Sequence, residues 1–394
     1  MSANLTVVGA SQAPAVAPEV EGLYAAARAM VPTLVDLGGK TTAERSVPAE
    51  TIAAFQNAGF FRVLQPKKYG GYQMPFSVFA NLVRELAHGC ASSAWVYAVT
   101  GELGWVMAMF PEEGQAEVWR DPSAIGCAAI DPAGRADEDA GGYRLTGRWR
   151  FVSGSDHAQW VMVTAPCGEP PIIRQFLVRR NEFETVDDWH VLGLQGTGSR
   201  TLVADKVFVP AHRTITQEGM LTGSTPGADV HTNHPVYRSP RRYLTAFSLS
   251  PVLVGLAERA LTIVVEGTAR KLTAGQLLPD LEGFQLRVGE AAASVETARA
   301  ILDRHLQEAD RRLAAGEAIS DFDVQRNRMM ASHMMRVARD AVDRLCTATG
   351  SGWIFDNTAL NVVFRDTIAG ATHRAMNFDA NAKTYARSLG LRIP

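Results

Sequence analysis

The chain begins with apolar residues that recur at helical spacing. Met30, Leu34 and Leu37 lie three or four residues apart, and Gly38-Gly39 then interrupts the run. The same spacing predicts further helices over residues 49–58, 76–87 and 92–109, which end close to a Gly or a Pro. Residues 1–120 are therefore predicted to form an N-terminal helical domain.

The period then changes from helical to alternating. In residues 143–151, Tyr, Leu, Trp and Phe occupy one face while Arg and Thr occupy the other, which is the pattern of a half-buried strand. Strand-like runs follow at 160–164, 175–179 and 201–209, separated by Gly and Pro. These runs predict a middle antiparallel β-barrel over residues 121–232.

Helical spacing returns from Leu244 onward and is stronger than before. Apolar residues at alternating steps of four and three run from Phe284 to Ala309, and residues 320–323 resemble a capping box that opens the next helix. Residues 233–394 are predicted to form a C-terminal four-helix bundle. The predicted fold class is mainly α with a central β domain.

Composition and charge exclude several classes of protein. The 394 residues carry 39 Lys+Arg and 41 Asp+Glu, a formal charge of −2, which argues against nucleic-acid and anionic-membrane binders. No run approaches the ~18 continuous apolar residues of a membrane span, and the first 22 residues are interpreted as a loose tail and not a signal peptide. The four cysteines form no C-x-x-C pair and are predicted to be buried thiols: Cys90, Cys127, Cys167 and Cys346. A soluble, cytoplasmic protein follows.

Common cofactor and metal motifs do not occur. Gly196-Thr197-Gly198-Ser199 precedes a strand and is not a dinucleotide-binding G-x-G-x-x-G, and there is no Walker-type loop or nucleophile elbow. His231 and His234 have metal-like spacing but no neighbouring carboxylate pair, so no metal site is predicted.

Three segments suggest chemistry, although each also has a plain structural interpretation. Residues 151–157 end a strand with small and polar side chains, and residues 193–199 form a glycine-dense turn suited to close approach of a planar or anionic ligand. That turn is equally a simple connection. His373 lies among polar residues near the C-terminus, where a capped surface histidine is the alternative.

The motifs in these segments, taken together, resemble one family. They are SSAW at 92–95, FVSG at 151–154, SGSDHAQW at 153–160, GLQGTGSRTLVADKVFVP at 193–210, FRD at 364–366, and His373 with Asn377 and Asp379. Their order is similar to the acyl-CoA dehydrogenase superfamily. The closer resemblance is to oxygenase components of two-component flavin-dependent monooxygenases, such as the 4-hydroxyphenylacetate and secosteroid phenol hydroxylases.

Two departures favour the oxygenases over the dehydrogenases. Residues 130–135 read IDPAGR where dehydrogenases usually carry a T-E-P-x-x-G-S-D-like signature, and no Glu follows Arg365-Asp366 within residues 371–377. Removing an acyl-CoA α-proton requires a positioned base. An acyl-CoA dehydrogenase-like FAD oxidoreductase remains the alternative, as does N- or S-oxygenation within the oxygenase branch.

The resemblance implies a mechanism and a set of residues. Reduced FMN or FAD would come from a separate NAD(P)H-dependent flavin reductase and react with molecular oxygen to a C4a-hydroperoxide, which hydroxylates an aromatic or phenolic molecule. Ser153 would bond flavin N5, and His373 would serve as the acid/base group. The other residues expected to hold the flavin are Trp95, Ala128, Ala129, Ile130, Phe151, Val152 and Arg374, with Arg270, Thr349, Gly350 and Ser351 reaching its phosphate across a subunit boundary of a homotetramer.

The residues expected to contact the substrate are Trp95, Leu103, His157 and Tyr237. Some phenol hydroxylases of this type carry a His where Leu103 stands, so an acceptor more apolar than a simple acidic phenol is predicted. The resemblance assigns His157 no specific role.

Overall fold

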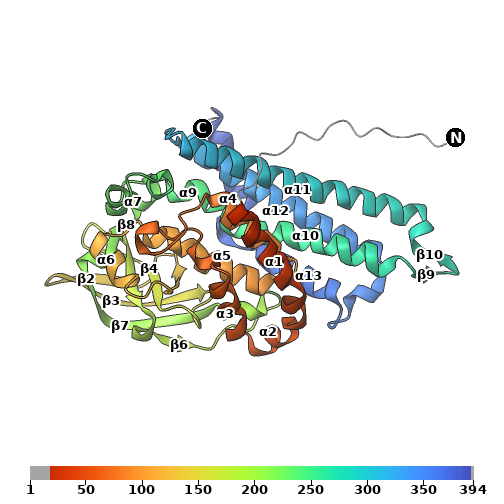
Figure 1. Ribbon diagram of the computed structural model, residues 1–394, viewed down its shortest axis with the longest axis horizontal. Coiled ribbons are helices and arrows are strands. Elements are labelled where there is room, and N and C mark those ends of the chain that lie inside the picture. Colours follow the sequence, from red (N-terminus) through yellow and green to blue (C-terminus); the bar gives the residue numbers. More distant parts are fainter. Residues whose placement is uncertain (1–17, 392–394) are drawn as a thin grey trace.

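The computed structural model describes residues 18–391 and places helices at both ends of the chain around a central sheet (Figure 1). Most of the predicted N-terminal tail lies outside the described residues, and its last part already belongs to a helix, because α1 begins at Pro18. The N-terminal helices are α1 (Pro18–Asp36), α2 (Gly38–Glu44), α3 (Ala49–Asn57), α4 (Phe76–Ala87), α5 (Ala91–Met107) and α6 (Glu112–Val118). The break predicted at Gly38-Gly39 is also the start of α2.

The central strands are β1 (Gly126–Ala129), β2 (Arg135–Asp139), β3 (Gly142–Val152), β4 (Trp160–Cys167), β5 (Ile172–Arg179), β6 (Glu184–Val186), β7 (Arg200–Pro210) and β8 (Thr214–Thr216). They form one sheet in the order β6-β7-β3-β2-β4-β5-β8, with β1 paired to β4. Most neighbours are antiparallel as predicted, but β1 and β2 run parallel to β4, so the sheet is mixed. Side chains from both halves of this sheet enclose one apolar core, which includes Trp149 of β3, Val163 of β4 and Phe176 of β5.

The C-terminal helices are α7 (Gln217–Thr222), α8 (Pro226–Val230), α9 (Arg241–Leu244), α10 (Ala246–Thr268), α11 (Glu282–Ala314), α12 (Asp321–Ala348), α13 (Ala359–Ala371) and α14 (Phe378–Ser388), with a two-stranded hairpin of β9 (Leu272–Thr273) and β10 (Gln276–Leu277). The capping box at Ser320 is confirmed, because its hydroxyl accepts from the Asp323 amide and the Asp323 carboxylate accepts from the Ser320 amide. The segment 241–268 is long and apolar enough to cross a bilayer, but 67% of its window is buried within the protein. It is the interior helix of the bundle.

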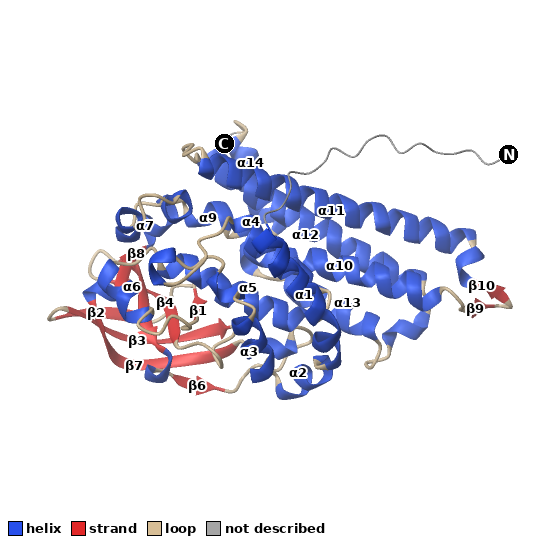
Figure 2. Ribbon diagram, viewed as in Figure 1, coloured by secondary structure: helices blue, strands red, loops and turns tan. Residues whose placement is uncertain are grey.

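Helix α5 joins the three parts of the fold. It packs against α4 on the N-terminal side, against β1 of the sheet and against α10 of the bundle, and Figure 2 shows it between the strands and the long helices. Every residue of α5 is buried except Val99. Groups from all three parts can therefore converge along this helix.

Candidate active site

The ends of two strands lie against α5. A Cβ on Gly154, just after β3, would lie 2.9 Å from the Thr100 methyl and 3.2 Å from a Val96 methyl. A Cβ on Gly126, at the start of β1, would lie 3.3 Å from the Cβ of Leu103. These close approaches hold the FVSG segment beside α5 and fix Ser153 within the core, where it is buried.

A chain of hydroxyl groups orients Ser153. Its Oγ lies 2.6 Å from Ser199 Oγ, which lies 2.6 Å from Thr197 Oγ1, and the Thr197 hydroxyl donates to the Leu194 carbonyl at 3.0 Å. Because the Thr197 proton is committed to Leu194, Ser199 donates to Thr197 and Ser153 donates to Ser199. The lone pairs of Ser153 are then left to accept a hydrogen bond from an N–H donor.

His373 lies between α13 and the short η9 helix (Arg374–Met376), edge-on to Trp95 of α5. Its Nδ1 is buried and has no hydrogen-bond partner within residues 18–391. Burial lowers the pKa of His373 from 6.5 to about 4. The imidazole is therefore neutral at pH 7 and carries one donor and one acceptor.

The glycine-dense turn is anchored to α13. The Leu194 amide donates to Asp366 Oδ1 at 2.6 Å, and a Cβ on Gly193 would lie 2.1 Å from the Arg365 carbonyl oxygen, so only glycine fits there. Burial raises the pKa of Asp366 from 3.8 to about 6. The turn that orients Ser153 and the helix that carries His373 therefore form one framework.

The end of β3 presents an exposed aromatic ring. Phe151 has a left-handed φ of 62°, which is costly for a bulky residue, and is 59% exposed. Trp189 meets it edge-on, with ring centroids 6.0 Å apart. A small pocket of about 130 Å³ lies beside Phe151, Trp189 and Ser199. The Arg150 guanidinium carbon lies 5.1 Å from the centroid of the Phe151 ring, and the ring's remaining exposed surface fits contact with a planar ligand.

The end of β1 is connected to the segment that carries His373. Within the described residues β1 pairs only with β4, so the other edge of Ala128 and Ala129 has no strand partner. Ile130 is 39% exposed, and the next residue, Asp131, forms an ion pair with Arg374 at 2.5 Å. This pair ties the end of β1 to the segment that carries His373.

Three further predicted site residues can be placed by their contacts. Leu103 faces Gly126 in the core, and the buried Tyr237 donates its hydroxyl to the Leu64 carbonyl at 3.0 Å, so that hydroxyl is already engaged. His157 follows the FVSG segment, with its Nε2 buried and unpartnered within the described chain, and burial lowers its pKa.

Arg270 and the Thr349-Gly350-Ser351 turn lie together at the end of α10 and α12, where Lys271 Nζ donates to the Thr349 carbonyl at 2.7 Å. This end, next to β9 and β10, is the end of the bundle remote from the sheet (Figure 1). These residues are not brought to Ser153 within one chain.

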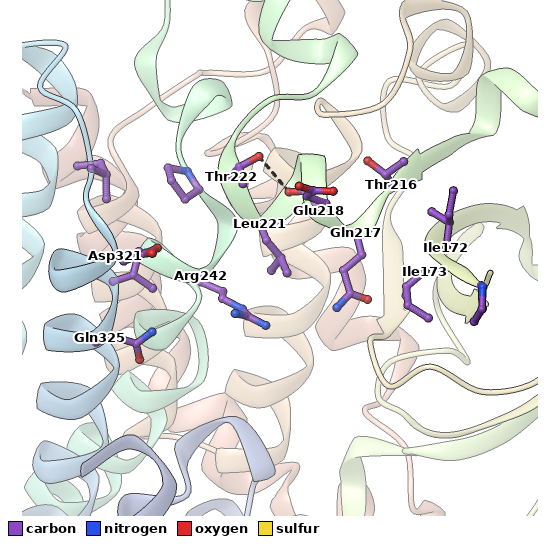
Figure 3. A pocket seen from close by; sticks show the side chains of 14 residues that line it. Ile172, Ile173, Thr216, Gln217, Glu218, Leu221, Thr222, Arg242, Asp321 and Gln325 are labelled. Atoms are coloured by element: carbon purple, nitrogen blue, oxygen red, sulfur yellow. Dashed lines mark hydrogen bonds between the residues drawn. The ribbon is translucent and has the colours of Figure 1, made fainter. Parts of the chain in front are cut away.

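One open pocket lies away from Ser153 and His373. It has a volume of about 770 Å³ and is open between the β5 and β8 ends of the sheet and α9 and α12 (Figure 3). Gln217 and Gln325 line it, and each has a buried side-chain oxygen without a partner in the described residues. None of the residues predicted from the motifs lines it.

Two groups bear on metal binding. His231 Nε2 and Gln115 Oε1 are hydrogen-bonded at 2.8 Å. Glu113, Glu117 and His212 come within 4.8 Å of one another, but Arg213 already pairs with the Glu117 carboxylate. The four cysteines are free; three are buried and Cys90 is partly exposed.

Comparisons with known proteins show the family of the chain. Residues 18–126 match the acyl-CoA dehydrogenase N-terminal domain, and residues 247–378 match the acyl-CoA dehydrogenase C-terminal domain. The oxygenase subunit HsaA, a flavin-dependent monooxygenase of Rhodococcus jostii, is 32% identical over 88% of this chain and 92% of its own. The chain belongs to the acyl-CoA dehydrogenase superfamily, in its branch of flavin-dependent monooxygenases.

Two further relatives support this membership of the oxygenase branch. The oxygenase component of the FADH2-dependent resorcinol hydroxylase of Rhizobium sp. is 34% identical to the oxygenase described here, over 89% of each chain. The crystal structure of the 3-HSA hydroxylase of Rhodococcus sp. RHA1 superimposes with a TM-score of 0.90 at 30% identity, covering 95% and 98% of the two chains.

The motifs assigned no role to several residues that contact the candidate site. Ser199 and Thr197 were part of a quoted motif but had no role before their hydroxyl contacts with Ser153 were known. Asp366 was noted only as part of FRD, and Trp189 carried no sequence signal.

Proposed function

We propose that this oxygenase binds reduced FAD or FMN between β1, β3, α5 and α13 and hydroxylates a phenolic or other electron-rich aromatic molecule. The observation that carries the proposal is the framework that joins Ser153, which follows the exposed Phe151, to a neutral and partly buried His373. The relatives named as a flavin-dependent monooxygenase and an FADH2-dependent resorcinol hydroxylase support the same activity.

The residues present fit a flavin. Reduced flavin carries an N–H at N5, and Ser153 has lone pairs free to accept from it. Phe151 offers a partly exposed ring and Val152 a buried flank, while the free edge of β1 offers backbone amides and carbonyls to the polar edge of the ring system. These features support binding of the isoalloxazine at this junction.

The bound flavin supplies the two electrons that activate molecular oxygen, so that one oxygen atom enters the aromatic ring and the other leaves as water. The protein contributes positioning and proton control. The acceptor nitrogen of neutral His373 accepts a hydrogen bond from the phenolic hydroxyl and takes its proton as the ring attacks oxygen, when that hydroxyl becomes strongly acidic. Trp95 fixes the imidazole plane, and the apolar walls of α5 exclude water.

The acyl-CoA dehydrogenase alternative is not supported by this geometry. The segment after α13 places an imidazole where a carboxylate base would be needed, and the nearby Asp366 is engaged with the Leu194 amide. N- or S-oxygenation would use the same oxygen chemistry, and no observation favours it over ring hydroxylation.

Assembly and partners belong to the same proposal. A homotetramer would bring Arg270 and the Thr349–Ser351 turn of one subunit to the flavin phosphate of a neighbour, which explains their distance from Ser153 in a single chain. A separate NAD(P)H-dependent reductase would supply the reduced flavin, in the cytoplasm. The relative named as an oxygenase component supports such a partner.

The test is to mix anaerobic protein and reduced flavin with oxygen and a panel of phenols, indoles and polycyclic aromatics. Hydroxylated product, matched to flavin consumed and containing oxygen from labelled O₂, is expected for at least one phenol. Release of hydrogen peroxide as the sole product across the panel would overturn the proposal. Bleaching of oxidised FAD by an acyl-CoA would instead establish a dehydrogenase.

A further inference from the structure

The segment that carries His373 lies at the surface between α13 and α14. Thr372, Arg374 and Asn377 are exposed, whereas Met376 is buried. The hydrogen bonds inside the segment are local: the Met376 amide donates to the His373 carbonyl at 2.9 Å. The Asn377 amide likewise donates to the Arg374 carbonyl at 3.2 Å. Such bonds fix the shape of the segment but not its distance from the helices beneath it.

One buried side chain holds this segment to the bundle. Asn381 of α14 is 1% exposed, and its Nδ2 donates to the Ala375 carbonyl at 3.1 Å and to Ser332 Oγ of α12 at 2.6 Å. A carbonyl can only accept, so the orientation of this amide is fixed. The Ser332 hydroxyl is oriented in turn, because it donates to the Arg328 carbonyl at 2.9 Å. Asn381 therefore joins α12 to the backbone two residues after His373.

An ion pair at the surface also reaches this segment. Arg374 pairs with Asp131, but the two side chains are 76% and 57% exposed. Exposed ion pairs contribute little, because water screens the charges and both side chains lose freedom. Hydrogen bonds in a buried amide are stronger and more directional. The bonds of Asn381 therefore constrain the segment more than the Arg374–Asp131 pair does.

The docking of α14 on α12 does not depend on the Asn381 amide alone. The Phe378 ring lies 6.4 Å from the His333 ring, measured between centroids, and 4.7 Å from the Arg336 guanidinium carbon. The Asn377 side chain caps α14 by accepting from the Ala380 amide at 2.9 Å. A change at Asn381 can therefore release the His373 segment while α14 stays in place.

The protonation state of His373 depends on where this segment lies. Burial lowers the pKa of His373 to about 4, while the nearby Asp131 raises it and Arg374 lowers it by smaller effects. Trp95, on the α5 side, is uncharged. An outward shift of the segment would hydrate the imidazole and return its pKa toward the ordinary value of 6.5.

We infer that Asn381 is a positioning residue for His373. It ties the Ala375 carbonyl to Ser332 of α12 and so holds the imidazole against Trp95. Asn381 acts through the backbone and touches neither flavin nor substrate. The inference rests on the proposed function for the use of His373 in catalysis, whereas the position of the imidazole can be measured without turnover.

The experiment measures how fast diethyl pyrocarbonate modifies His373 between pH 5 and pH 8, followed by the mass of the peptide that contains it. The reagent attacks neutral imidazole, so the pH dependence of the rate reports the pKa. In the wild type the rate should be slow and nearly constant over this range. In Asn381→Ala it should be faster at pH 8 and fall about tenfold or more toward pH 5, as expected for a pKa of about 6 or higher.

Two further variants separate positioning from stability. Ser332→Ala removes the anchor on α12 but leaves the Asn381–Ala375 bond, so it should change the rate profile in the same direction by less. Asn327→Ala is the matched control, because Asn327 is also 1% exposed on α12 and its Nδ2 donates to the Tyr243 carbonyl at 3.1 Å. This control should lower the melting temperature but keep the wild-type rate profile of His373.

A wild-type rate profile in folded Asn381→Ala would overturn the inference, and Ser332→Ala decides in the same way if Asn381→Ala does not fold. An equal change in Asn327→Ala would also overturn it, because general loosening would then explain the effect. In turnover, kcat/KM of Asn381→Ala for a phenol should acquire an acidic limb at the pKa found by modification. Absence of hydroxylated product in the wild type would overturn the proposed function alone, since the modification rates do not depend on turnover.

Discussion

The His373 imidazole stands edge-on to the Trp95 indole, with ring centroids 5.7 Å apart and planes inclined by 67°. This contact joins α5 to the segment after α13 and buries Nδ1 of the imidazole. The acid/base group of the proposed site is therefore fixed by an apolar neighbour, and burial keeps it neutral.

Because His373 is neutral, kcat/KM is predicted to stay constant on the acidic side of its pH profile. With a pKa of about 4, His373 stays neutral from pH 8 down to about pH 5, so kcat/KM for a phenol should not fall through pH 6.5. His373→Asn should lower kcat/KM by about 100-fold across this range, within the usual size of acid/base catalysis. An acidic limb near pH 6.5 in the wild type that disappears in His373→Asn would contradict this assignment.

Removal of the Ser153 hydroxyl should uncouple flavin oxidation from hydroxylation. Ser153→Ala takes away an acceptor that the Ser199–Thr197 chain orients, and we expect about tenfold less product per flavin consumed, with the difference released as hydrogen peroxide. Peroxide and product are quantified in the same reaction. Ser248→Ala, another buried serine away from the site, is the control and should keep the wild-type ratio; equal ratios in both variants would remove Ser153 from the site.

Much of this arrangement could be predicted from the sequence because the signals are local. Helix α4 has the predicted bounds, since its hydrophobic period and the flanking Pro75 and Gly89 lie within a few residues of one another. The motifs also located Ser153 and His373, which the structure holds on one framework.

Other features depend on partners that are distant in the chain. The pairing of Asp366 with Leu194 spans 172 residues, and that of Glu102 with Arg241 spans 139. Tyr237 was expected at the substrate, but its hydroxyl is engaged by Leu64, 173 residues away. Strand β1 has only four residues, too few for an alternating pattern to indicate its parallel pairing with β4.

The partly desolvated Asp366 carboxylate should lower stability at neutral pH. Its pKa is raised from 3.8 to about 6, so the folded state favours the protonated form, and this contribution is fully present below pH 3.8 and lost as the pH rises through 6. Asp366→Asn retains an oxygen to accept from the Leu194 amide without the charge. Because the residue is partly exposed, we expect a gain of about 1 to 2 kcal/mol in the free energy of unfolding at pH 7.

This gain should shrink toward zero as the pH is lowered from 6 to 4, as measured by urea denaturation at several pH values. Asp379→Asn, on the first turn of α14, is the control and should show no such pH-dependent gain. A destabilised Asp366→Asn at pH 7 would mean that the carboxylate charge supports the turn.

Shared sites between subunits can be tested by mixing two impaired variants. Arg270→Gln removes the proposed phosphate contact and His373→Asn removes the acid/base group, so each variant alone should have low activity. If Arg270 serves the neighbouring subunit, a hybrid pair of the two variants contains one intact site and one doubly altered site. Random assembly of equal amounts should then restore roughly a quarter of the wild-type activity.

The control mixes wild type with the Arg270→Gln/His373→Asn double variant. This mixture should leave roughly a quarter of the sites intact if the site is shared, and about half if it is contained in one chain. No recovery in the first mixture together with half activity in the second would place Arg270 in the site of its own subunit.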